Sequence, residues 1–301
     1  MEERLRGGFV FGWKVIAYLF LAGVGGGAAA VGAAFHLIHP EATFITWTSV
    51  ILGAPLVIVG CGLLFLDLGR PQAAFRALSR PNHAWIARGT IILTAFVVLE
   101  AIQFAWLIWP FQGLTSGSSL FTFLNVLGGV FGVLTVTYTG LLFNTTRSIP
   151  FWSTPILPLL FLVSGVSTGA LGLILFLLAS GPPVRQEIGL LSQIDLFLLL
   201  FEALVFAFYL HGMHEVTAAR ASVRRLIKGD LSAAFWGGVV LIGLVIPFLV
   251  EAFWAGRAFL LFGCLCGLVG GIYVRYVVVT GAVKAPLNAE GVLIPLTPRP
   301  E

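Results

Sequence analysis

The feature that most constrains this chain is a series of eight long apolar segments. They cover residues 13–38, 44–66, 88–109, 121–143, 155–179, 190–211, 231–250 and 257–281. Each is long enough to cross the hydrocarbon core of a bilayer, which takes about 20 helical residues. The segments are too long for strands and lack the polar alternation of a β-barrel. We therefore predict an all-α integral membrane protein, a bundle of eight transmembrane helices.

Composition supports this fold class. The chain is 58% hydrophobic and only 10% charged, whereas soluble domains average about 25% charged residues. We therefore expect membrane lipid around the bundle and no nucleic-acid partner. The first apolar segment is longer than the roughly 7–15 residues of a signal-peptide core, so we expect a retained helix. We treat residues 1–301 as one membrane domain with two four-helix halves, 1–150 and 151–301.

Basic residues are distributed unevenly between the two faces of the predicted bundle. With eight spans both termini share one face, and 14 of the 17 Lys and Arg residues belong to it. The opposite face has Arg185 and Arg257, and Arg275 lies within the last span. The positive-inside rule then predicts a multi-pass protein of the inner (cytoplasmic) membrane with both termini in the cytoplasm.

An acidic and a basic residue follow the second span. Asp67 and Arg70 are three residues apart at the end of the predicted helix, so they can pair on one face. A surface ion pair that ends the helix is the simpler interpretation. A catalytic role is the alternative, and we keep both residues as candidates.

Several polar residues are predicted at mid-membrane depth. Glu100 and Gln103 lie in the third span, and Asp195 and Glu202 lie seven residues apart on one face of the sixth. A charge at this depth costs roughly 2.5–3.5 kcal/mol, so such groups are usually paired, protonated or in contact with water. Glu100 and Glu202 are predicted at similar depth. Either these two acids share a proton or lie on a proton path, or one neutral acid makes an interhelical hydrogen bond. Asp195 is a further candidate for the proton path.

Two tyrosines lie towards the cytoplasmic ends of their spans, Tyr18 in the first and Tyr138 in the fourth. A phenol at this depth is typical of the aromatic belt of membrane proteins. Its hydroxyl is also suited to hydrogen-bonding a quinone carbonyl, but the residues alone favour the belt interpretation.

Cysteines and histidines do not show the spacing of a metal site. The three cysteines lie in apolar runs, with no C-x-x-C pair and no iron–sulfur spacing. Among the five histidines, no two are predicted at matched depth on facing spans, as a bis-histidine haem requires. We predict no haem, no iron–sulfur cluster and no other metal in this chain.

Short motifs spread along the chain resemble the membrane subunits of the NrfD/polysulfide reductase family. Two of these motifs are specific in combination, Asp-Leu-Gly-Arg-Pro at 67–71 and Ser-Gly-x-Ser-Thr-Gly at 164–169. The similarity extends from the glycine-rich part of the first span to the eighth span. The other residues that carry it are Phe75, Pro81, Asn82, Trp85, Tyr138, Thr139, Gly140, Pro150, Phe151, Trp152, Pro155, Leu157, Pro158, Arg275 and Tyr276.

The resemblance implies a quinone-reactive subunit, with menaquinone or ubiquinone bound in the first half. It implies partners too, namely a ferredoxin-like iron–sulfur subunit and a large molybdopterin catalytic subunit. The quinone pocket would map to Tyr18 and Tyr138, with the Asp67–Arg70 loop nearby. Some family members carry a histidine at the position of Tyr18. The isolated chain is expected to have no catalytic activity, because its electrons must come from a partner.

Two alternatives to the quinone-reactive subunit remain. A passive membrane anchor would need no polar pocket, so Tyr18, Tyr138 and Asp67 argue against it. A secondary transporter or ion channel would use acids such as Glu100, Asp195 and Glu202, but we see no clear inverted repeat. A combination, in which quinone chemistry drives proton movement, is also compatible with the sequence. Because relatives dock their partners on the face with the termini, we expect the iron–sulfur partner on the cytoplasmic side.

Overall fold

The computed structural model describes residues 12–40, 42–67, 85–107, 119–145, 149–180, 185–253 and 256–283. In these ranges the regular structure is helical, and eight helices are long and apolar enough to cross a membrane. The predicted fold class and number of spans are therefore confirmed. The helices are α1 (Trp13–Ile38), α2 (Thr43–Asp67), α4 (Trp85–Leu107), α5 (Ser119–Asn144), α6 (Ile156–Ser180), α7 (Arg185–Glu215), α8 (Thr217–Lys228), η3 (Ala234–Val245), α9 (Ile246–Phe253) and α10 (Arg257–Thr280).

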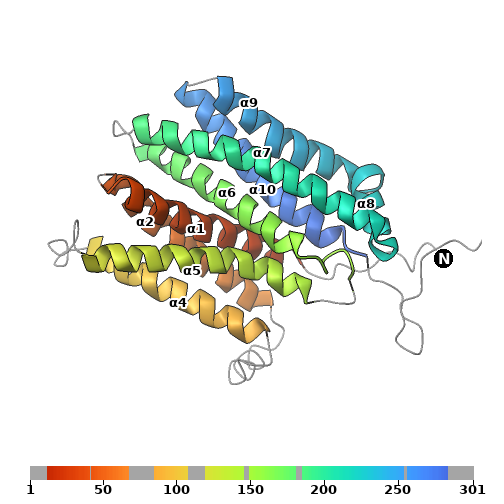
Figure 1. Cartoon of the computed structure of the whole chain (residues 1–301), viewed down its shortest axis with the longest axis horizontal. Coiled ribbons are helices and arrows are strands. Elements are labelled where there is room, and N and C mark those ends of the chain that lie inside the picture. The colour runs from red at the N-terminus through yellow and green to blue at the C-terminus, as the bar shows by residue number, and fades with distance from the viewer. Residues whose placement is uncertain are drawn as a thin grey trace, which may run out of the picture.

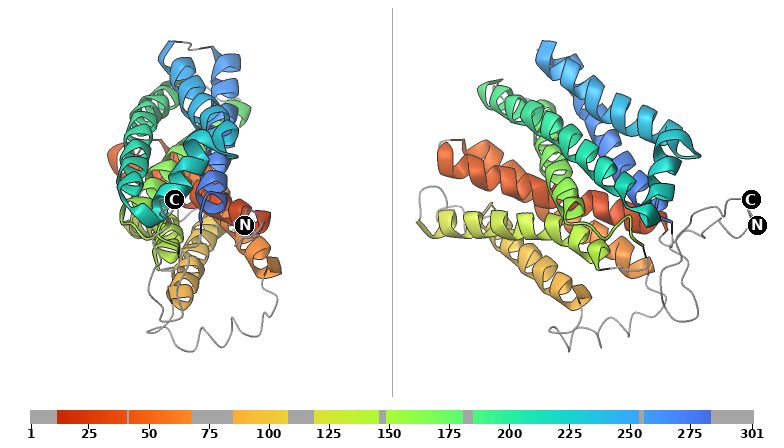
Figure 2. Two further views of the ribbon diagram at one scale, coloured as in Figure 1. Left: turned by 90° about the vertical axis from the view of Figure 1, so that its right-hand side faces the viewer. Right: turned by 45° about the vertical axis from the view of Figure 1, so that its right-hand side comes forward.

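Two helices form the centre of the bundle. Within their apolar windows α1 is 78% and α6 is 72% buried, whereas the other six spans are at most 39% buried. Figures 1 and 2 show α2, α4 and α5 on one side of this pair and α7, α9 and α10 on the other. Because α1 contacts α2, α5, α6 and α10, it joins the two halves of the chain.

Glycines let α1 approach its neighbours backbone to backbone. A Cβ atom added at Gly27 would overlap the carbonyl oxygen of Gly165 on α6. A Cβ atom added at Gly26 would lie 2.7 Å from the carbonyl oxygen of Gly132 on α5. Small residues at such crossings allow close helix packing inside a membrane.

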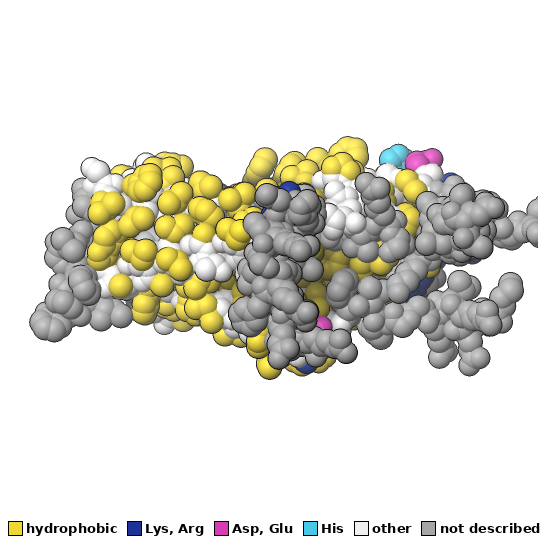
Figure 3. Space-filling view, turned by 90° about the horizontal axis from the view of Figure 1, so that it is seen from below, with side chains coloured by type: hydrophobic (Ala, Val, Ile, Leu, Met, Phe, Trp, Pro, Cys, Tyr) yellow, Lys and Arg dark blue, Asp and Glu magenta, His cyan; other side chains and the backbone are white. Residues whose placement is uncertain are grey.

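The outer surface of the bundle is apolar, as a lipid-facing surface must be. In Figure 3, the side chains that can be seen on the described part of one face are mostly hydrophobic. Large apolar side chains are exposed on the peripheral helices, such as Val98 of α4, Val130 of α5 and Leu200 of α7 at 50%, 50% and 56%. Lipid tails are the natural cover for this surface.

The seventh span differs from a regular helix. Its first part, η3, is a π-helix, in which the N–H of Ile246 bonds to the carbonyl of Leu241 five residues earlier. The change to α-helix occurs next to Pro247, which has no N–H and whose ring would clash with the carbonyl of an α-helical preceding turn. π-Helical segments are rare in proteins, and those that occur are often found at functional sites.

One helix was not expected from the sequence. The apolar segments predict a basic loop after the sixth span, but Thr217–Lys228 forms α8, which follows α7 directly. A search for long apolar runs misses it, because basic and hydroxyl side chains interrupt its sequence and only one face is apolar.

Candidate functional site

The two tyrosines identified in the sequence lie together in the first half. Tyr18 of α1 is 1% exposed and Tyr138 of α5 is 4% exposed. They are close enough to interact electrostatically, and Cys61 of α2 is an electrostatic neighbour of both. Both rings belong to the same hydrophobic core cluster. The structure thus brings together the two residues that the family resemblance assigns to one pocket.

Glycines on two helices make room for these rings. A Cβ atom at Gly89 of α4 would overlap Cζ of Tyr138, so only glycine fits there. A Cβ atom at Gly60 of α2 would lie 3.4 Å from Cδ2 of Tyr18. The tyrosine pair is therefore held between four helices, α1, α2, α4 and α5.

The hydroxyl group of Tyr18 is chemically unusual. It is buried, and within the described part of the chain it has no hydrogen-bond partner. A buried hydroxyl without a partner costs about 1–3 kcal/mol. In a native protein such a group calls for a polar ligand atom or a water.

Asp67 lies at the same end of the bundle as the tyrosine pair. Its carboxylate is 3.8 Å from the ammonium group of Lys14, one helical turn before Tyr18 on α1. Lys14 also donates a hydrogen bond of 3.2 Å to the carbonyl of Leu66. The expected partner, Arg70, lies outside the described residues, so the Asp67–Arg70 pair stays a prediction. Lys14 was not anticipated, because its contact with Asp67 joins residues far apart in the sequence.

A second polar group surrounds Glu100 of α4. Glu100 is 2% exposed, and one of its oxygens accepts a hydrogen bond of 3.4 Å from Gln103. Gln103 in turn accepts a hydrogen bond of 3.0 Å from Asn125 of α5. The other carboxyl oxygen of Glu100 is buried and, among the described residues, has no partner. It lies 3.2 Å from the position of a Cβ atom at Gly53 on α2.

Glu100 and Glu202 are not brought together. The neighbours of Glu100 are on α2, α4 and α5, whereas those of Glu202 are on α6 and α10. Figure 1 shows α4 and α7, which carry these acids, on opposite sides of the bundle. The interpretation that these two acids share a proton is therefore wrong. Similar depth does not imply contact, because the central helices α1 and α6 pack between α4 and α7.

Glu202 instead lies within electrostatic range of the arginine of the last span. Arg275 of α10 is 1% exposed and donates hydrogen bonds to the hydroxyl of Ser164 and to the carbonyl of Gly271. Ser164 is also a hydrogen-bond partner of Glu202, which interacts electrostatically with Arg275. Buried charged groups of this kind are stable only when hydrogen bonds and an opposite charge compensate them.

Asp195 has its own partners next to Glu202 and Arg275. It is fully buried, and its Oδ1 accepts a hydrogen bond of 2.7 Å from Ser167 of α6. Glu251 of α9 is an electrostatic neighbour of Asp195, and Glu202 is another. The structure therefore gathers three acids and one arginine between α6, α7, α9 and α10. We call Asp195, Glu202, Glu251 and Arg275 the acid–arginine cluster.

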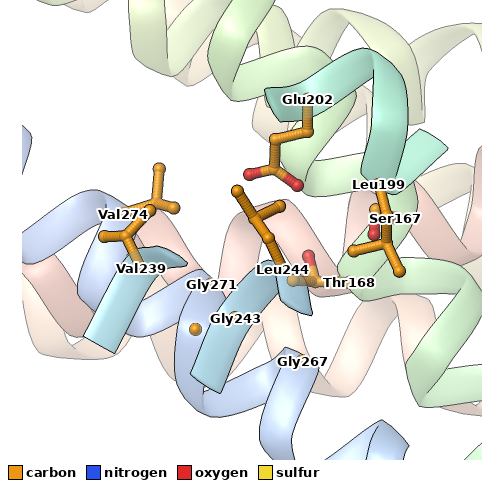
Figure 4. A pocket seen from close by; sticks show the side chains of 11 residues that line it. Ser167, Thr168, Leu199, Glu202, Val239, Gly243, Leu244, Gly267, Gly271 and Val274 are labelled. Atoms are coloured by element: carbon orange, nitrogen blue, oxygen red, sulfur yellow. The ribbon is translucent and has the colours of Figure 1, made fainter. Parts of the chain in front are cut away.

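A small cavity opens beside this cluster. Figure 4 shows the Glu202 carboxylate directed towards it, with Thr168 on α6 and Gly243 on the π-helix among its walls. The volume open to the centre of a water molecule is about 10 Å³, close to what one bound water needs. The cavity thus offers a place for a water in contact with a buried carboxyl.

Two members of the cluster were not among the predicted site residues. Arg275 was visible as the basic residue inside the last span, and a basic residue at that depth needs an acidic partner. Glu251 gives a weaker signal because it lies near the end of its span. Within the described ranges, His, Cys, Asp and Glu side chains form no group of three or more that could hold a metal ion.

Comparison with known proteins identifies the family of this chain. The family model described as "Polysulphide reductase, NrfD" matches residues 2–285. The chain belongs to this family. The C chain of polysulfide reductase from Wolinella succinogenes is 32% identical over 263 residues, covering 79% of this chain and 81% of that protein. Protein NrfD of Escherichia coli is 28% identical over 298 residues, covering 89% and 93%.

A third relative extends the range of named complexes. The C subunit of selenate reductase from Mesobacillus selenatarsenatis is 24% identical over 327 aligned positions, covering 92% of this chain and 74% of that protein. Two of the three relatives are thus named as one chain or subunit of a reductase. With eight candidate membrane spans, the NrfD-family chain described here is a multi-pass membrane protein.

Proposed function

We propose that this NrfD-family chain is the quinone-reactive membrane subunit of a multi-subunit oxidoreductase. The buried tyrosine pair carries the proposal. Tyr18 and Tyr138 are neighbours inside an otherwise apolar core, and the Tyr18 hydroxyl lacks a partner among the described residues. A lipid-soluble ligand requires an apolar site between helices with a few well-placed polar groups.

The chemistry of the site suits a quinone headgroup. Menaquinone and ubiquinone have an apolar ring and two carbonyl oxygens that accept hydrogen bonds, which the phenols of Tyr18 and Tyr138 can donate. Quinone reduction takes up two electrons and two protons. Asp67, at the same end of the bundle, is our candidate for proton transfer, together with Arg70.

The electrons are exchanged with partner subunits. We assign this role to a ferredoxin-like iron–sulfur subunit attached to a large molybdopterin catalytic subunit. The support is that relatives are named as the C chain of a polysulfide reductase and the C subunit of a selenate reductase. A protein of this kind works as an electron-exchanging anchor and is not an enzyme in isolation.

The decisive experiment compares two Tyr→Phe variants in the purified complex. Tyr138→Phe removes a hydroxyl from the proposed pocket, and Tyr273→Phe removes one from α10 as the matched control. We measure oxidation or reduction of a menaquinol or ubiquinol analogue, and separately the activity with an artificial mediator. Tyr138→Phe should lower quinone-linked activity about tenfold, as expected for the loss of one hydrogen bond. Mediator activity should stay normal.

Two other results would contradict the proposal. If Tyr138→Phe retains full quinone-linked activity, the pocket lies elsewhere or the chain is a passive anchor. If Tyr138→Phe and Tyr273→Phe lose activity equally with both electron donors, the effect reflects folding of the complex and not the pocket.

Proton movement is a second candidate function, favoured by the acid–arginine cluster. Two buried acids, the half-buried Glu251, one buried arginine and a cavity sized for one water lie in the second half, apart from the tyrosine pair. Carboxyls with such neighbours are suited to holding and passing a proton. Glu100, hydrogen-bonded to Gln103, is the corresponding candidate in the first half.

The test uses the complex in sealed vesicles. Asp195→Asn should abolish quinone-driven acidification or alkalinisation of the vesicle interior, while quinone-linked electron transfer continues. Vesicles in which proton movement is equal for Asp195→Asn and the unmodified complex would rule out this role.

A further inference from the structure

The amphipathic helix α8 lies at the boundary of the membrane. Only Val216 separates it from α7, and five residues separate it from η3. Both neighbours are membrane spans, so α8 cannot leave the bilayer surface. Figure 1 shows α8 beyond the end of α7, at one end of the bundle. Its 12 residues extend about 18 Å at the rise of an α-helix.

One face of α8 is apolar and buried, and another is basic and exposed. Ala219, Val223 and Leu226 are buried against the bundle. Arg220, Arg224 and Lys228 are exposed. We call these three residues the basic row. They are four residues apart and therefore lie along one side of the helix.

The bundle holds α8 in a fixed position. Arg225 forms an ion pair of 2.6 Å with Asp230 and donates a hydrogen bond of 3.3 Å to the carbonyl of Thr280 at the end of α10. The hydroxyl of Ser222 accepts a hydrogen bond of 3.0 Å from the N–H of Val283. The row is thus presented by a rigid helix, which lowers the entropy cost of binding.

The charges of the basic row are available to a ligand. In the part of the chain that the structure describes, Arg224 and Lys228 have no side-chain hydrogen bond or ion pair. Arg220 uses only its Nε–H, which donates to the carbonyl of His214 at 2.9 Å, so its two terminal NH2 groups remain free. Three cations along one side of a helix form a site for an anion.

The surroundings of the row favour a lipid headgroup as that anion. Trp236, 52% exposed, donates its indole N–H to the carbonyl of Ile227, next to Lys228. Phe208 on α7 is 59% exposed, and Val216, at the start of α8, is 41% exposed. Tryptophans with this combination of exposed ring and bonded N–H mark the headgroup level of a bilayer. The row therefore borders the lipid-facing surface.

We infer that the basic row of α8 is a binding site for anionic phospholipid headgroups. The phosphate groups lie against Arg220, Arg224 and Lys228, while the acyl chains cover the exposed apolar surface of α7 and η3. The inference is independent of the quinone site, because α8 packs mainly against α7 and η3, which do not hold the tyrosine pair.

The experiment measures lipid binding to the purified full-length protein in detergent. After delipidation, the protein is titrated with phosphatidylglycerol or with phosphatidylcholine, and bound lipids are counted by native mass spectrometry. Phosphatidylglycerol should bind in preference, and salt should weaken its binding. The triple variant Arg220→Gln/Arg224→Gln/Lys228→Gln should lose affinity for phosphatidylglycerol by roughly a hundredfold, about fivefold for each charge.

A charge-conserving variant separates headgroup binding from folding. Arg220→Lys/Arg224→Lys should keep most of the affinity, because a phosphate group recognises either cation. The inference fails if the triple variant binds phosphatidylglycerol as the unmodified protein does. It also fails if the triple variant keeps its lipid but no longer co-purifies with partner subunits, since the row would then be a protein contact.

Discussion

At the scale of single residues, the stability of a charged side chain buried inside the membrane depends on an oppositely charged neighbour. Arg275 and Glu202 are 1% and 4% exposed, and each is the electrostatic partner of the other. Removing one member of such a pair leaves the other charge buried and uncompensated, which costs more than the pair itself contributes.

Replacing Arg275 with methionine should therefore destabilise the protein by about 3–5 kcal/mol. The double variant Arg275→Met/Glu202→Gln should recover much of this loss, because no charge is then left alone. Arg257→Met on the same helix serves as control, since Arg257 is exposed and only donates to the carbonyl of Leu178. The stability of all three variants is measured by thermal unfolding in detergent. Equal losses of stability for Arg275→Met and the double variant would contradict the electrostatic coupling of Arg275 and Glu202.

At the scale of helices, packing is decided by where two backbones meet. The crossing of α1 and α6 at Gly27 and Gly165 leaves no room for a side chain, whereas Gly62 of α2 has no atom within 4 Å of an added Cβ. The same residue type is therefore indispensable at one place and replaceable at another, which composition cannot show.

Two alanine substitutions test this difference. Gly27→Ala should destabilise the bundle by about 1–3 kcal/mol because α1 and α6 must move apart. Gly62→Ala should be neutral or stabilise by up to about 1 kcal/mol, as alanine is the better helix former. The readout is the midpoint of thermal unfolding. Similar effects at the two positions would refute the close crossing.

The turn after α8 contains a titratable ion pair outside the membrane spans. The hydrogen bonds that Arg225 donates lower the pKa of Asp230, and the same contact raises the pKa of Arg225. A carboxyl with a lowered folded-state pKa stabilises the fold above its unfolded pKa, near 3.9. This stabilisation is lost as the pH falls through the folded pKa.

The protein should therefore lose a small part of its stability below about pH 4, and Asp230→Asn should remove that part of the pH dependence. The effect is small because the carboxyl is 61% exposed to solvent. Unfolding midpoints between pH 3 and pH 6 provide the measurement. An unchanged pH profile in Asp230→Asn would show that the pair does not contribute.

At the scale of the whole molecule, the asymmetry of charge predicts orientation. Fourteen of the 17 basic residues belong to the face with both termini, and on that basis we propose that this face is cytoplasmic, in the inner membrane. The proposed iron–sulfur partner would then dock from the cytoplasm.

Reporter fusions at the C-terminus test this orientation. A reporter that is active only in the cytoplasm should be active in the fusion, and one that is active only outside should be silent. The reverse pattern would place the terminal face, and with it the partner subunits, on the outer side.

The sequence by itself determined the eight spans. Their number, order and approximate ends follow from local properties, because each helix satisfies its own backbone and its length must match the bilayer. The amphipathic α8 and the π-helix η3 did not follow from apolar length. Helix α8 has a mixed composition of apolar and basic residues. The π-helix η3 depends on how the chain accommodates Pro247 within a packed span.

Only the tertiary structure decided which polar residues meet. Glu202 was predicted at a depth similar to that of Glu100, but its electrostatic neighbour is Arg275, and Asp195 accepts a hydrogen bond from Ser167. The proximity of Tyr18 and Tyr138 agrees with the family resemblance, while their role stays a prediction. Depth in the membrane can be read from position along a helix. Which residue lies opposite at that depth depends on the order and rotation of the helices. Close crossings such as that of Gly27 with Gly165 set this order and rotation. No short stretch of sequence reveals them.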